Sequence, residues 1–149
     1  MQFQKSNTKF KVAILGLGHQ ALEDYLPAVL ASKDVYLSGI VEIDEEKISL
    51  FQKEHKEIPI YKSFDHLLKD QKINFVIITL PHYLHYDATK KTIQNKIHVL
   101  KEKPMAISLN QAKELKKLAE KKQCSNCSYN AKKVQSYLFN IYAVNRQNW

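Results

Sequence analysis

A short glycine-containing segment near the N-terminus constrains the fold of this chain more than any other feature. Residues 12–15 form an apolar run typical of a buried strand, and a Gly-x-Gly-x-x-Ala pattern follows at residues 16–21. In such a pattern Gly16 allows a tight turn, Gly18 lets the backbone approach a pyrophosphate, and Ala21 keeps helix and strand close. The segment therefore predicts a dinucleotide-binding turn, in which the N-terminus of the next helix attracts the phosphates.

An acidic residue follows the glycine turn at the expected distance. Glu42 ends the strand-like run 35–41 and lies 21 positions after Ala21, close to the spacing of roughly 20 residues for a carboxylate that binds the adenine ribose. A carboxylate at this place repels a 2′-phosphate, which favours NAD over NADP as the cofactor. The alternative interpretation is that Glu42 is one of several surface acids in residues 42–46.

The length and composition are those of one globular domain. A chain of 149 residues with 44% hydrophobic and 26% charged residues can bury a core. Residues 1–9 lack the apolar centre of a signal peptide, and the longest apolar run, 75–80, is too short to cross a bilayer. We therefore expect a cytoplasmic protein without a membrane partner.

The formal net charge of +8 is concentrated in the last third of the chain. Residues 1–100 contain 13 lysines against 12 acids, whereas residues 101–149 contain nine lysines and Arg146 against three acids. A basic segment can bind nucleic acid, but bidentate recognition of phosphate and guanine relies on arginine, and Arg146 is the only arginine. We favour a solvated, lysine-rich helix face and expect no nucleic-acid partner.

Two cysteines, Cys124 and Cys127, form a Cys-x-x-Cys pattern. A zinc site needs a second ligand pair nearby, which the sequence lacks. A redox motif needs a helix N-terminus after a strand, whereas Ser and Asn residues surround these cysteines. We interpret both as reduced thiols without a role in chemistry, and we expect no metal.

Strand-like and helical segments alternate over residues 9–122. The expected strands are 10–15, 35–41, 58–61, 75–80 and 97–100. The expected helices follow Gly18 or lie at 45–55, 64–69, 83–95 and after Ser108. This order predicts a Rossmann-type α/β fold, a doubly wound parallel sheet with helices on both faces. Because ligands bind beyond the carboxyl ends of such strands, the segments at Gly16, Pro81 and Glu102 should share one crevice.

Two of the expected helices carry specific local signals. In the helix after Gly18, Pro27 removes a hydrogen bond and should bend or interrupt the helix near residues 23–25. The last helix should begin with a capping box formed by Ser108 and Gln111. The buried stripe expected after Gly18 consists of Leu22, Tyr25, Leu26, Val29 and Leu30.

The two ends of the chain depart from this alternating pattern. Residues 1–8 are expected to be a flexible N-terminus, and residues 123–149 a divergent tail that becomes helical from about 131. An amphipathic helix in this tail needs a partner surface. That partner is this domain, a second copy, or nothing if the tail is disordered. The apolar stripe of the tail consists of Val134, Tyr137, Leu138, Ile141 and Tyr142.

Four parts of the sequence together resemble the N-terminal domain of the glucose–fructose oxidoreductase and inositol dehydrogenase (Gfo/Idh/MocA) family. They are residues 16–21, Glu42, residues 79–85 (Thr-Leu-Pro-His-Tyr-Leu-His) and residues 98–106 (His-Val-Leu-Lys-Glu-Lys-Pro-Met-Ala). The most specific is Glu-Lys-Pro at a strand end, far downstream of a dinucleotide turn. The resemblance covers about residues 9–122 and implies hydride transfer between NAD(P) and a sugar, polyol or related hydroxy substrate.

The resemblance also implies residue roles. Lys103 would contact substrate near the nicotinamide and assist proton transfer, Glu102 would set that lysine and the cofactor, and Pro104 would shape the turn, with a cis peptide bond accessible to it. His82 and His85 would line the nicotinamide side, and His85 joins Lys103 as a candidate catalytic residue. The candidate cofactor-binding residues are Gly16, Leu17, Gly18, His19, Gln20, Glu42, Leu80, Pro81, His82, Glu102 and Lys103.

The chemistry of the residues supports part of this assignment independently. Oxidation of an alcohol needs a base for the hydroxyl proton, and a lysine whose pKa is lowered by burial or nearby cations can serve. The alternative for Lys103 is an ordinary surface lysine. His82 and His85 lack the further ligands of a metal site, and His98, at a strand start, is interpreted as structural.

The chain departs from the family at its C-terminal end. Members continue into a larger mixed α/β domain that supplies a further Asp and His and often mediates oligomerisation, and residues 123–130 only loosely resemble the strand leading into it. One hypothesis is a truncated NAD-dependent oxidoreductase with little or no turnover alone. The other is a stand-alone dinucleotide-binding module that associates with itself or another chain through the tail stripe. We expect a homo-oligomer.

Overall fold

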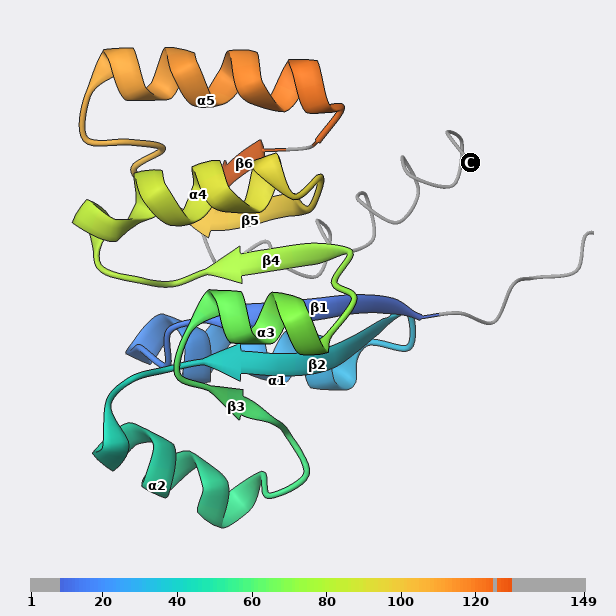
Figure 1. Ribbon diagram of the computed structural model, residues 1–149. Coiled ribbons are helices and arrows are strands. Elements are labelled where there is room, and N and C mark those ends of the chain that lie inside the picture. Colours follow the sequence, from blue (N-terminus) through green and yellow to red (C-terminus); the bar gives the residue numbers. More distant parts are fainter. Residues whose placement is uncertain (1–8, 125, 130–149) are drawn as a thin grey trace, which may run out of the picture.

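A six-stranded parallel sheet forms the centre of the molecule, in the order β3-β2-β1-β4-β5-β6 (Figure 1). The structure is a computed structural model that describes residues 9–124 and 126–129. The strands are β1 (Phe10–Leu15), β2 (Val35–Val41), β3 (Ile60–Tyr61), β4 (Phe75–Ile78), β5 (His98–Glu102) and β6 (Asn126–Tyr129). The helices are η1 (Ala21–Tyr25), α1 (Leu26–Ala31), α2 (Glu45–Glu54), α3 (Phe64–Asp70), η2 (His82–Leu84), α4 (His85–Gln94) and α5 (Leu109–Lys122). The predicted Rossmann-type fold is confirmed.

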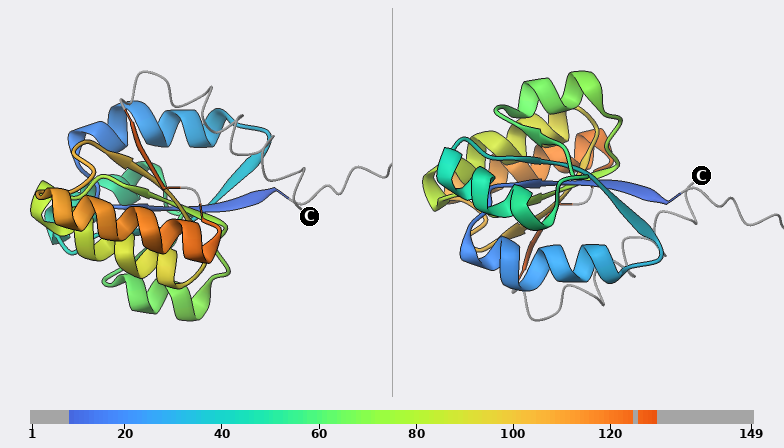
Figure 2. Two further views of the ribbon diagram at one scale, coloured as in Figure 1. Left: turned by 90° about the horizontal axis from the view of Figure 1, so that it is seen from above. Right: turned by 90° about the horizontal axis from the view of Figure 1, so that it is seen from below.

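Helices cover both faces of the sheet, so the central strands β1 and β4 are apolar on both sides. Along β1, Val12 and Ile14 join the core formed with α1 and α2, whereas Ala13 and Leu15 join the core formed with α3, α4 and α5. Figure 2 shows α1 on one face, opposite α4 and α5. This double coverage explains the unbroken apolar runs of the central strands.

The helix after the glycine turn is interrupted where Pro27 predicts. Residues Ala21–Tyr25 form a π-helical turn, closed by a hydrogen bond from the Leu26 N–H to the Ala21 carbonyl, and α1 begins at Leu26. The wider turn changes which side chains face the sheet. Leu22 is 43% exposed and Leu30 49% exposed, so their predicted burial was wrong, whereas Tyr25 and the rest of the stripe are buried as predicted.

Strand β5 runs two residues further than the sequence predicted. Lys101 pairs with Ile78 of β4, and Glu102 pairs with Tyr129 of β6. The reason is that β5 also pairs with β6, which adds a second set of hydrogen bonds as far as Glu102. Strand β6, residues 126–129, lies within the stretch that was interpreted as a divergent tail. Residues 1–8 and 130–149, including the expected tail helix, lie outside the described residues.

The capping box predicted for α5 is half formed. Ser108 Oγ accepts a hydrogen bond from the Gln111 N–H at 3.2 Å. The side-chain oxygen of Gln111 is buried without a hydrogen-bond partner, so the reciprocal bond that completes a capping box is absent. None of the helices within the described residues combines the length and apolar character needed to cross a membrane.

Candidate functional site

The glycine turn joins β1 to the first helix and lies against the end of β4. Gly16 has φ +96°, and a Cβ atom there would lie 3.1 Å from the Thr79 carbonyl oxygen. Thr79 Oγ1 donates a hydrogen bond to the Gly16 carbonyl at 2.8 Å. A left-handed φ and this close approach explain glycine at residue 16. At Gly18 a Cβ would meet only the Thr79 oxygen at 3.6 Å, so the fold itself leaves room there.

Glu42 is a buried carboxylate and not a surface acid, so the alternative interpretation of it was wrong. It is 8% exposed, and its oxygens accept hydrogen bonds from the N–H groups of Leu17 at 2.8 Å, Ile43 at 2.8 Å and Asp44 at 3.1 Å. Burial raises the pKa of Glu42, but the N–H groups together outweigh burial and lower it. Glu42 therefore stays ionised and ties the end of β2 to the glycine turn.

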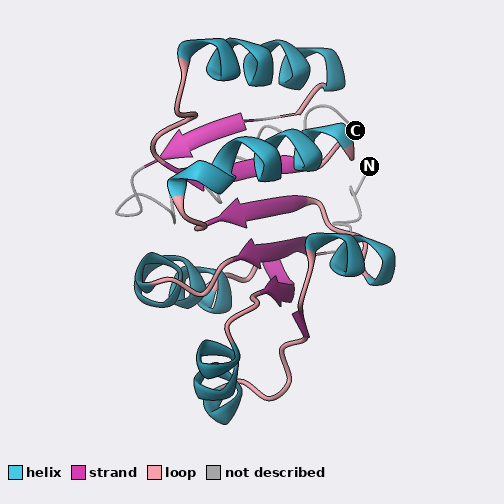
Figure 3. Cartoon of the chain, turned by 60° about the vertical axis from the view of Figure 1, so that its left-hand side comes forward, coloured by secondary structure: helices cyan, strands magenta, loops and turns pink. Residues whose placement is uncertain are grey.

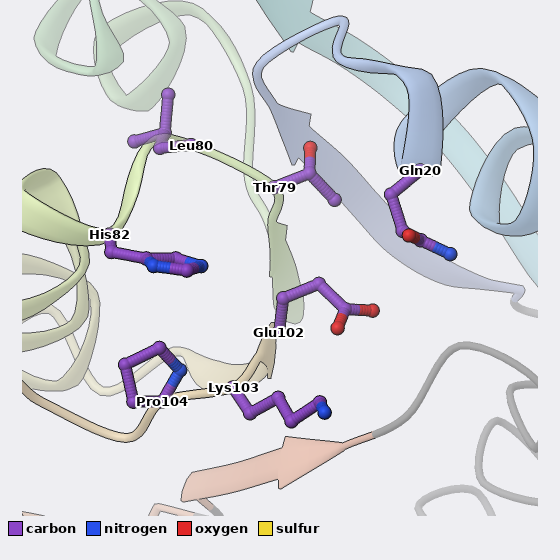
Figure 4. A pocket seen from close by; sticks show the side chains of 7 residues that line it. All are labelled: Gln20, Thr79, Leu80, His82, Glu102, Lys103 and Pro104. Atoms are coloured by element: carbon purple, nitrogen blue, oxygen red, sulfur yellow. The ribbon is translucent and has the colours of Figure 1, made fainter.

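Two adjacent hollows follow the carboxyl ends of the strands. Arrowheads of the central strands mark this edge of the sheet in Figure 3. The larger, of about 800 Å³, is lined by Gly16, Leu17, Gly18, Glu42, Ile43, Asp44, Lys47, Thr79, Leu80, Pro81, His82, Tyr83 and Leu84. The smaller, of about 480 Å³, is lined by Gln20, Thr79, Leu80, His82, Glu102, Lys103 and Pro104 (Figure 4). Thr79, Leu80 and His82 line both. The glycine turn and the Glu-Lys-Pro turn therefore share one crevice.

Of the eleven candidate cofactor-binding residues, all but His19 line this crevice. The side chain of His19 is 79% exposed, and its Nε2 atom lies 3.1 Å from Glu23. The sequence interpretation also missed lining residues, notably Ile43 and Tyr83, which are 75% and 69% exposed. The available signal was a large side chain within five residues of a strand end, Ile43 after β2 and Tyr83 after β4.

The Glu-Lys-Pro turn begins at the last residue of β5. The Lys103–Pro104 peptide bond is cis, and Figure 4 shows the Glu102 carboxylate and the Lys103 amine pointing toward the side of the crevice where Gln20 lies. The hydroxyl of fully buried Tyr25 donates a hydrogen bond to Glu102 at 2.5 Å. Burial and the neighbouring Glu102 raise the pKa of Tyr25, so the hydroxyl keeps its proton. The sequence interpretation treated Tyr25 only as a core residue.

His85 lies beneath the crevice and lines neither hollow. It is fully buried, with Nε2 at 2.7 Å from the Leu80 carbonyl oxygen and Nδ1 at 3.3 Å from the Pro104 carbonyl oxygen. Both ring nitrogens therefore face backbone. This geometry favours a positioning role over the contact with substrate that the resemblance implies for a catalytic histidine.

Lys101 is a second buried basic residue beneath the turn. Its side chain is fully buried, and Nζ donates hydrogen bonds to Thr89 Oγ1 at 3.1 Å and to the Met105 carbonyl. Burial lowers the pKa of Lys101 to about 8. The sequence interpretation assigned it no role, because its neighbours Glu102 and Lys103 carried the motif.

The described residues offer no cluster of three or more His, Cys, Asp or Glu side chains that could bind a metal ion. Cys124 is a free, half-buried thiol, and burial raises its pKa. A raised pKa keeps this sulfur in the less reactive thiol form at neutral pH.

Comparison with known proteins places this architecture in a family. The model of the Gfo/Idh/MocA oxidoreductases, described as an oxidoreductase family with an NAD-binding Rossmann fold, matches residues 10–130. The chain belongs to the Gfo/Idh/MocA family. It spans about 31% of the length of the curated relatives from Schizosaccharomyces pombe and Escherichia coli that it matches.

Several Gfo/Idh/MocA relatives are named dehydrogenases. The NADP(+)-dependent scyllo-inositol 2-dehydrogenase of Bacillus subtilis is 29% identical over 75% of this chain and 30% of its own length. An NADP(+)-dependent D-xylose 1-dehydrogenase of Haloferax volcanii is 33% identical over 66% of this chain and 30% of its own length. An uncharacterised oxidoreductase of Schizosaccharomyces pombe is 32% identical over 75% of this chain and 31% of its own length.

Solved structures share the fold of this Gfo/Idh/MocA domain. A mutant of a 3-ketoreductase from Actinomadura kijaniata, solved with NADP and TDP-benzene, superposes with a TM-score of 0.73 at 21% identity, over 82% of this chain and 38% of that one. An NAD-binding protein from Listeria innocua gives a TM-score of 0.71 at 22% identity, over 79% of this chain and 34% of that one.

Proposed function

We propose that this chain is the NAD-binding domain of a Gfo/Idh/MocA oxidoreductase that exchanges a hydride with a sugar, polyol or related hydroxy compound. The observation that carries the proposal is the crevice in which the glycine turn and the Glu-Lys-Pro turn meet, with Thr79, Leu80 and His82 common to its two hollows. An extended dinucleotide needs such continuity, because its phosphates and its reactive ring lie at opposite ends.

The glycine-turn end fits the adenosine half of the cofactor. Gly18 leaves space beside the backbone for a pyrophosphate, and the helix that follows presents free N–H groups to it. Ile43 and Tyr83 offer exposed apolar side chains on the walls of the larger hollow, which suit the faces of an adenine ring. Glu42 lies where the adenine ribose would be held.

The charges at this end favour NAD over NADP. The ionised Glu42 and its neighbour Asp44 both line the larger hollow, and a 2′-phosphate beside them would be repelled. Lys47 is a basic residue of the same wall, but it lowers the pKa of Glu42, which keeps that carboxylate negatively charged. Although two relatives carry NADP(+) in their names, we infer the opposite preference for this chain.

The Glu-Lys-Pro end fits the reacting half. A bound nicotinamide supplies the acceptor or donor of the hydride. Lys103 takes the proton of the substrate hydroxyl during oxidation and returns it during reduction. Glu102, held by the Tyr25 hydroxyl, orients the amine, and His82 supplies a polar wall. His85 acts beneath the floor as a positioning residue.

Titration with NADH and with NADPH, followed by nicotinamide fluorescence, tests the proposal. We expect saturable binding of NADH that is tighter than that of NADPH. Gly18→Ala should abolish binding while leaving the melting temperature unchanged, because its Cβ meets only an ordinary contact at 3.6 Å. Lys117→Ala, on an exposed position of α5, is the matched control and should bind as wild type does.

Two other results would change the proposal. Tight NADPH binding without NADH binding would overturn the role of Glu42, and the absence of binding by either would overturn the dinucleotide function. A panel of polyols and sugars with NAD then measures turnover. NADH binding with turnover would support hydride transfer by this chain, whereas NADH binding without turnover would support the cofactor site alone.

A further inference from the structure

Three buried polar side chains lie under the turn that carries Lys103, outside both hollows. They are His85 and Thr89 of α4 and Lys101 of β5, and each is fully buried. His85 and Thr89 are four residues apart, so they lie on the same side of α4. Alternation along β5 places Lys101 on the same face of the sheet as Val99, whose core includes residues of α4. The three side chains therefore belong to one layer between α4 and the sheet.

This layer contacts two consecutive carbonyl groups of the turn. A ring nitrogen of His85 lies 3.3 Å from the Pro104 oxygen, and the amine of Lys101 donates to the Met105 oxygen. His85 also contacts the carbonyl of Leu80 at 2.7 Å, and Leu80 lines both hollows. The turn beyond Lys103 is thus held from below by the hydrogen bond of Lys101, which also bonds Thr89 of α4, and it lies against the ring of His85.

The amine of Lys101 is energetically unfavourable at this position. Within the described residues no carboxylate lies within ion-pair distance of it, and burial of an amine without an acidic partner is unfavourable. The lowered pKa of Lys101 reflects that cost. An apolar side chain, like those of Val99 and Ile78, would suit the core better. An apolar side chain could make neither hydrogen bond of the amine, and of these two bonds the one to the Met105 carbonyl reaches the turn.

We propose that Lys101, supported by the hydroxyl of Thr89, is a positioning residue that fixes the Met105 carbonyl and thereby holds the Lys103 amine over the cofactor crevice. The inference rests on the proposed function, because it concerns the same cofactor site. It goes beyond that function because Lys101, which lies outside the crevice, determines how well Lys103 is ordered inside it.

A positioning role and a purely structural role predict different behaviour of Lys101→Met. Methionine keeps an unbranched side chain of similar length but cannot donate to the Met105 carbonyl. If Lys101 only stabilised the core, its loss would lower the melting temperature. If it positions the turn, we expect a melting temperature equal to or above that of wild type, because a buried amine is replaced by an apolar group, together with a disordered Lys103.

The experiment measures the acylation of Lys103 by a small excess of acetic anhydride, with and without saturating NADH, by peptide mass spectrometry. Wild type should show NADH slowing acylation about tenfold, a factor equivalent to about 1.4 kcal/mol. In Lys101→Met we expect the protection to fall below about twofold while the Kd for NADH changes by less than about threefold, since the glycine turn is intact. Lys117→Met, an exposed lysine of α5, is the matched control and should behave as wild type.

Thr89 provides the conservative rescue. Thr89→Val removes the hydroxyl that accepts from Lys101 and should reduce protection, whereas Thr89→Ser keeps the hydroxyl and should restore it. Full protection in Lys101→Met with NADH bound would overturn the inference. A joint loss of melting temperature, NADH affinity and protection, without rescue by serine, would also overturn it, because that is the signature of a structural residue.

Failure of the proposed function would be recognised separately. If wild type binds no NADH, the cofactor assignment fails, and the order of the turn is then read from hydrogen exchange of the Met105 and Ala106 amides in the free protein. Faster exchange in Lys101→Met and in Thr89→Val, with wild-type exchange in Thr89→Ser, would support the positioning role. Unchanged exchange in all three variants would overturn it.

Discussion

The two ends of the crevice are built in different ways. At the glycine-turn end the backbone forms the site, through the left-handed φ of Gly16 and the N–H groups that bind Glu42. At the Glu-Lys-Pro end, side chains from other elements hold the turn, among them Tyr25, which is 77 positions from Glu102. A site made by backbone conformation tolerates few residue types, whereas a site made by side chains depends on contacts that the motif does not contain.

Substitution of Gly16 should have the largest combined effect on NADH affinity and on stability. In Gly16→Ala the left-handed φ strains the backbone by roughly 1–3 kcal/mol, and the new Cβ presses on the Thr79 carbonyl at 3.1 Å. We expect NADH affinity to fall about a hundredfold and the urea midpoint to fall with it. Gly18→Ala is the contrast, since it should lose binding without losing stability. Equal stability of the two variants would contradict the backbone account of this end.

Substitution of Glu42 should have the next largest effect. Glu42→Gln retains one acceptor oxygen but loses the charge-assisted bonds, each worth roughly 1.5–3 kcal/mol. We expect about a tenfold loss of NADH affinity and a smaller difference between NADH and NADPH. Because the folded pKa of Glu42 is lowered, its stabilisation is present above the ordinary pKa of 4.5 and is lost as pH falls through the folded value. The unfolding free energy of Glu42→Gln should therefore fall less steeply in acid, and a parallel acid limb would contradict this.

Tyr25→Phe should lower NADH affinity less than Glu42→Gln does, but it should disturb the position of the Glu-Lys-Pro turn more. It removes the hydroxyl donor to Glu102 but keeps the buried ring, so NADH affinity should change less than about threefold. The loss of a hydrogen bond to a carboxylate should lower the free energy of unfolding by roughly 1.5–3 kcal/mol. Acylation of Lys103 in the presence of NADH reports the geometry. If its protection equals that of wild type, the Tyr25 contact does not order the Glu-Lys-Pro turn.

Lys101 should affect the pH dependence of stability with no measurable effect on NADH affinity at neutral pH. Burial lowers its pKa from 10.5 to about 8, so between these values the unfolded chain binds a proton that the folded chain does not. The penalty for burying the charged amine is complete below about pH 8 and is relieved as pH rises to 10.5. Urea unfolding should show wild type gaining stability relative to Lys101→Met over this range. Parallel profiles of the two proteins would contradict the burial of an ionisable amine.

The same contrast explains what could be predicted from the sequence. The succession of strands and helices over residues 9–122, the glycine turn and the crevice followed from local patterns, because apolar runs and a Gly-x-Gly spacing encode backbone geometry directly. The Tyr25–Glu102 bond and the layer of His85 and Lys101 did not, because they depend on which face of an element each side chain occupies. Tyr25 followed apolar periodicity, which predicts burial but gives no information about the partner of its hydroxyl.

The errors at element ends have a similar origin. β5 was predicted to stop at Leu100, whereas it continues to Glu102 because it pairs with β6. The burial expected of Leu22 assumed a regular helix, and the π-helical turn altered the spacing. The end of β5 was set by a neighbouring strand, and the exposure of Leu22 by a local irregularity of its helix. Neither cause changes the hydrophobic periodicity of the residues concerned.

Because β5 extends to Glu102, its last two residues and Lys103 lie in three different environments. Lys101 enters the layer against α4, Glu102 meets Tyr25 on the opposite face, and Lys103 lines the crevice. Because side chains alternate strictly along a strand, a slip of one residue would send the acid into the α4 layer and a cation toward Tyr25. The hydrogen bonds to β4 and β6 thus fix the register of β5. A single inserted or deleted residue in this strand would therefore disrupt the site even if the Glu-Lys-Pro motif were still present.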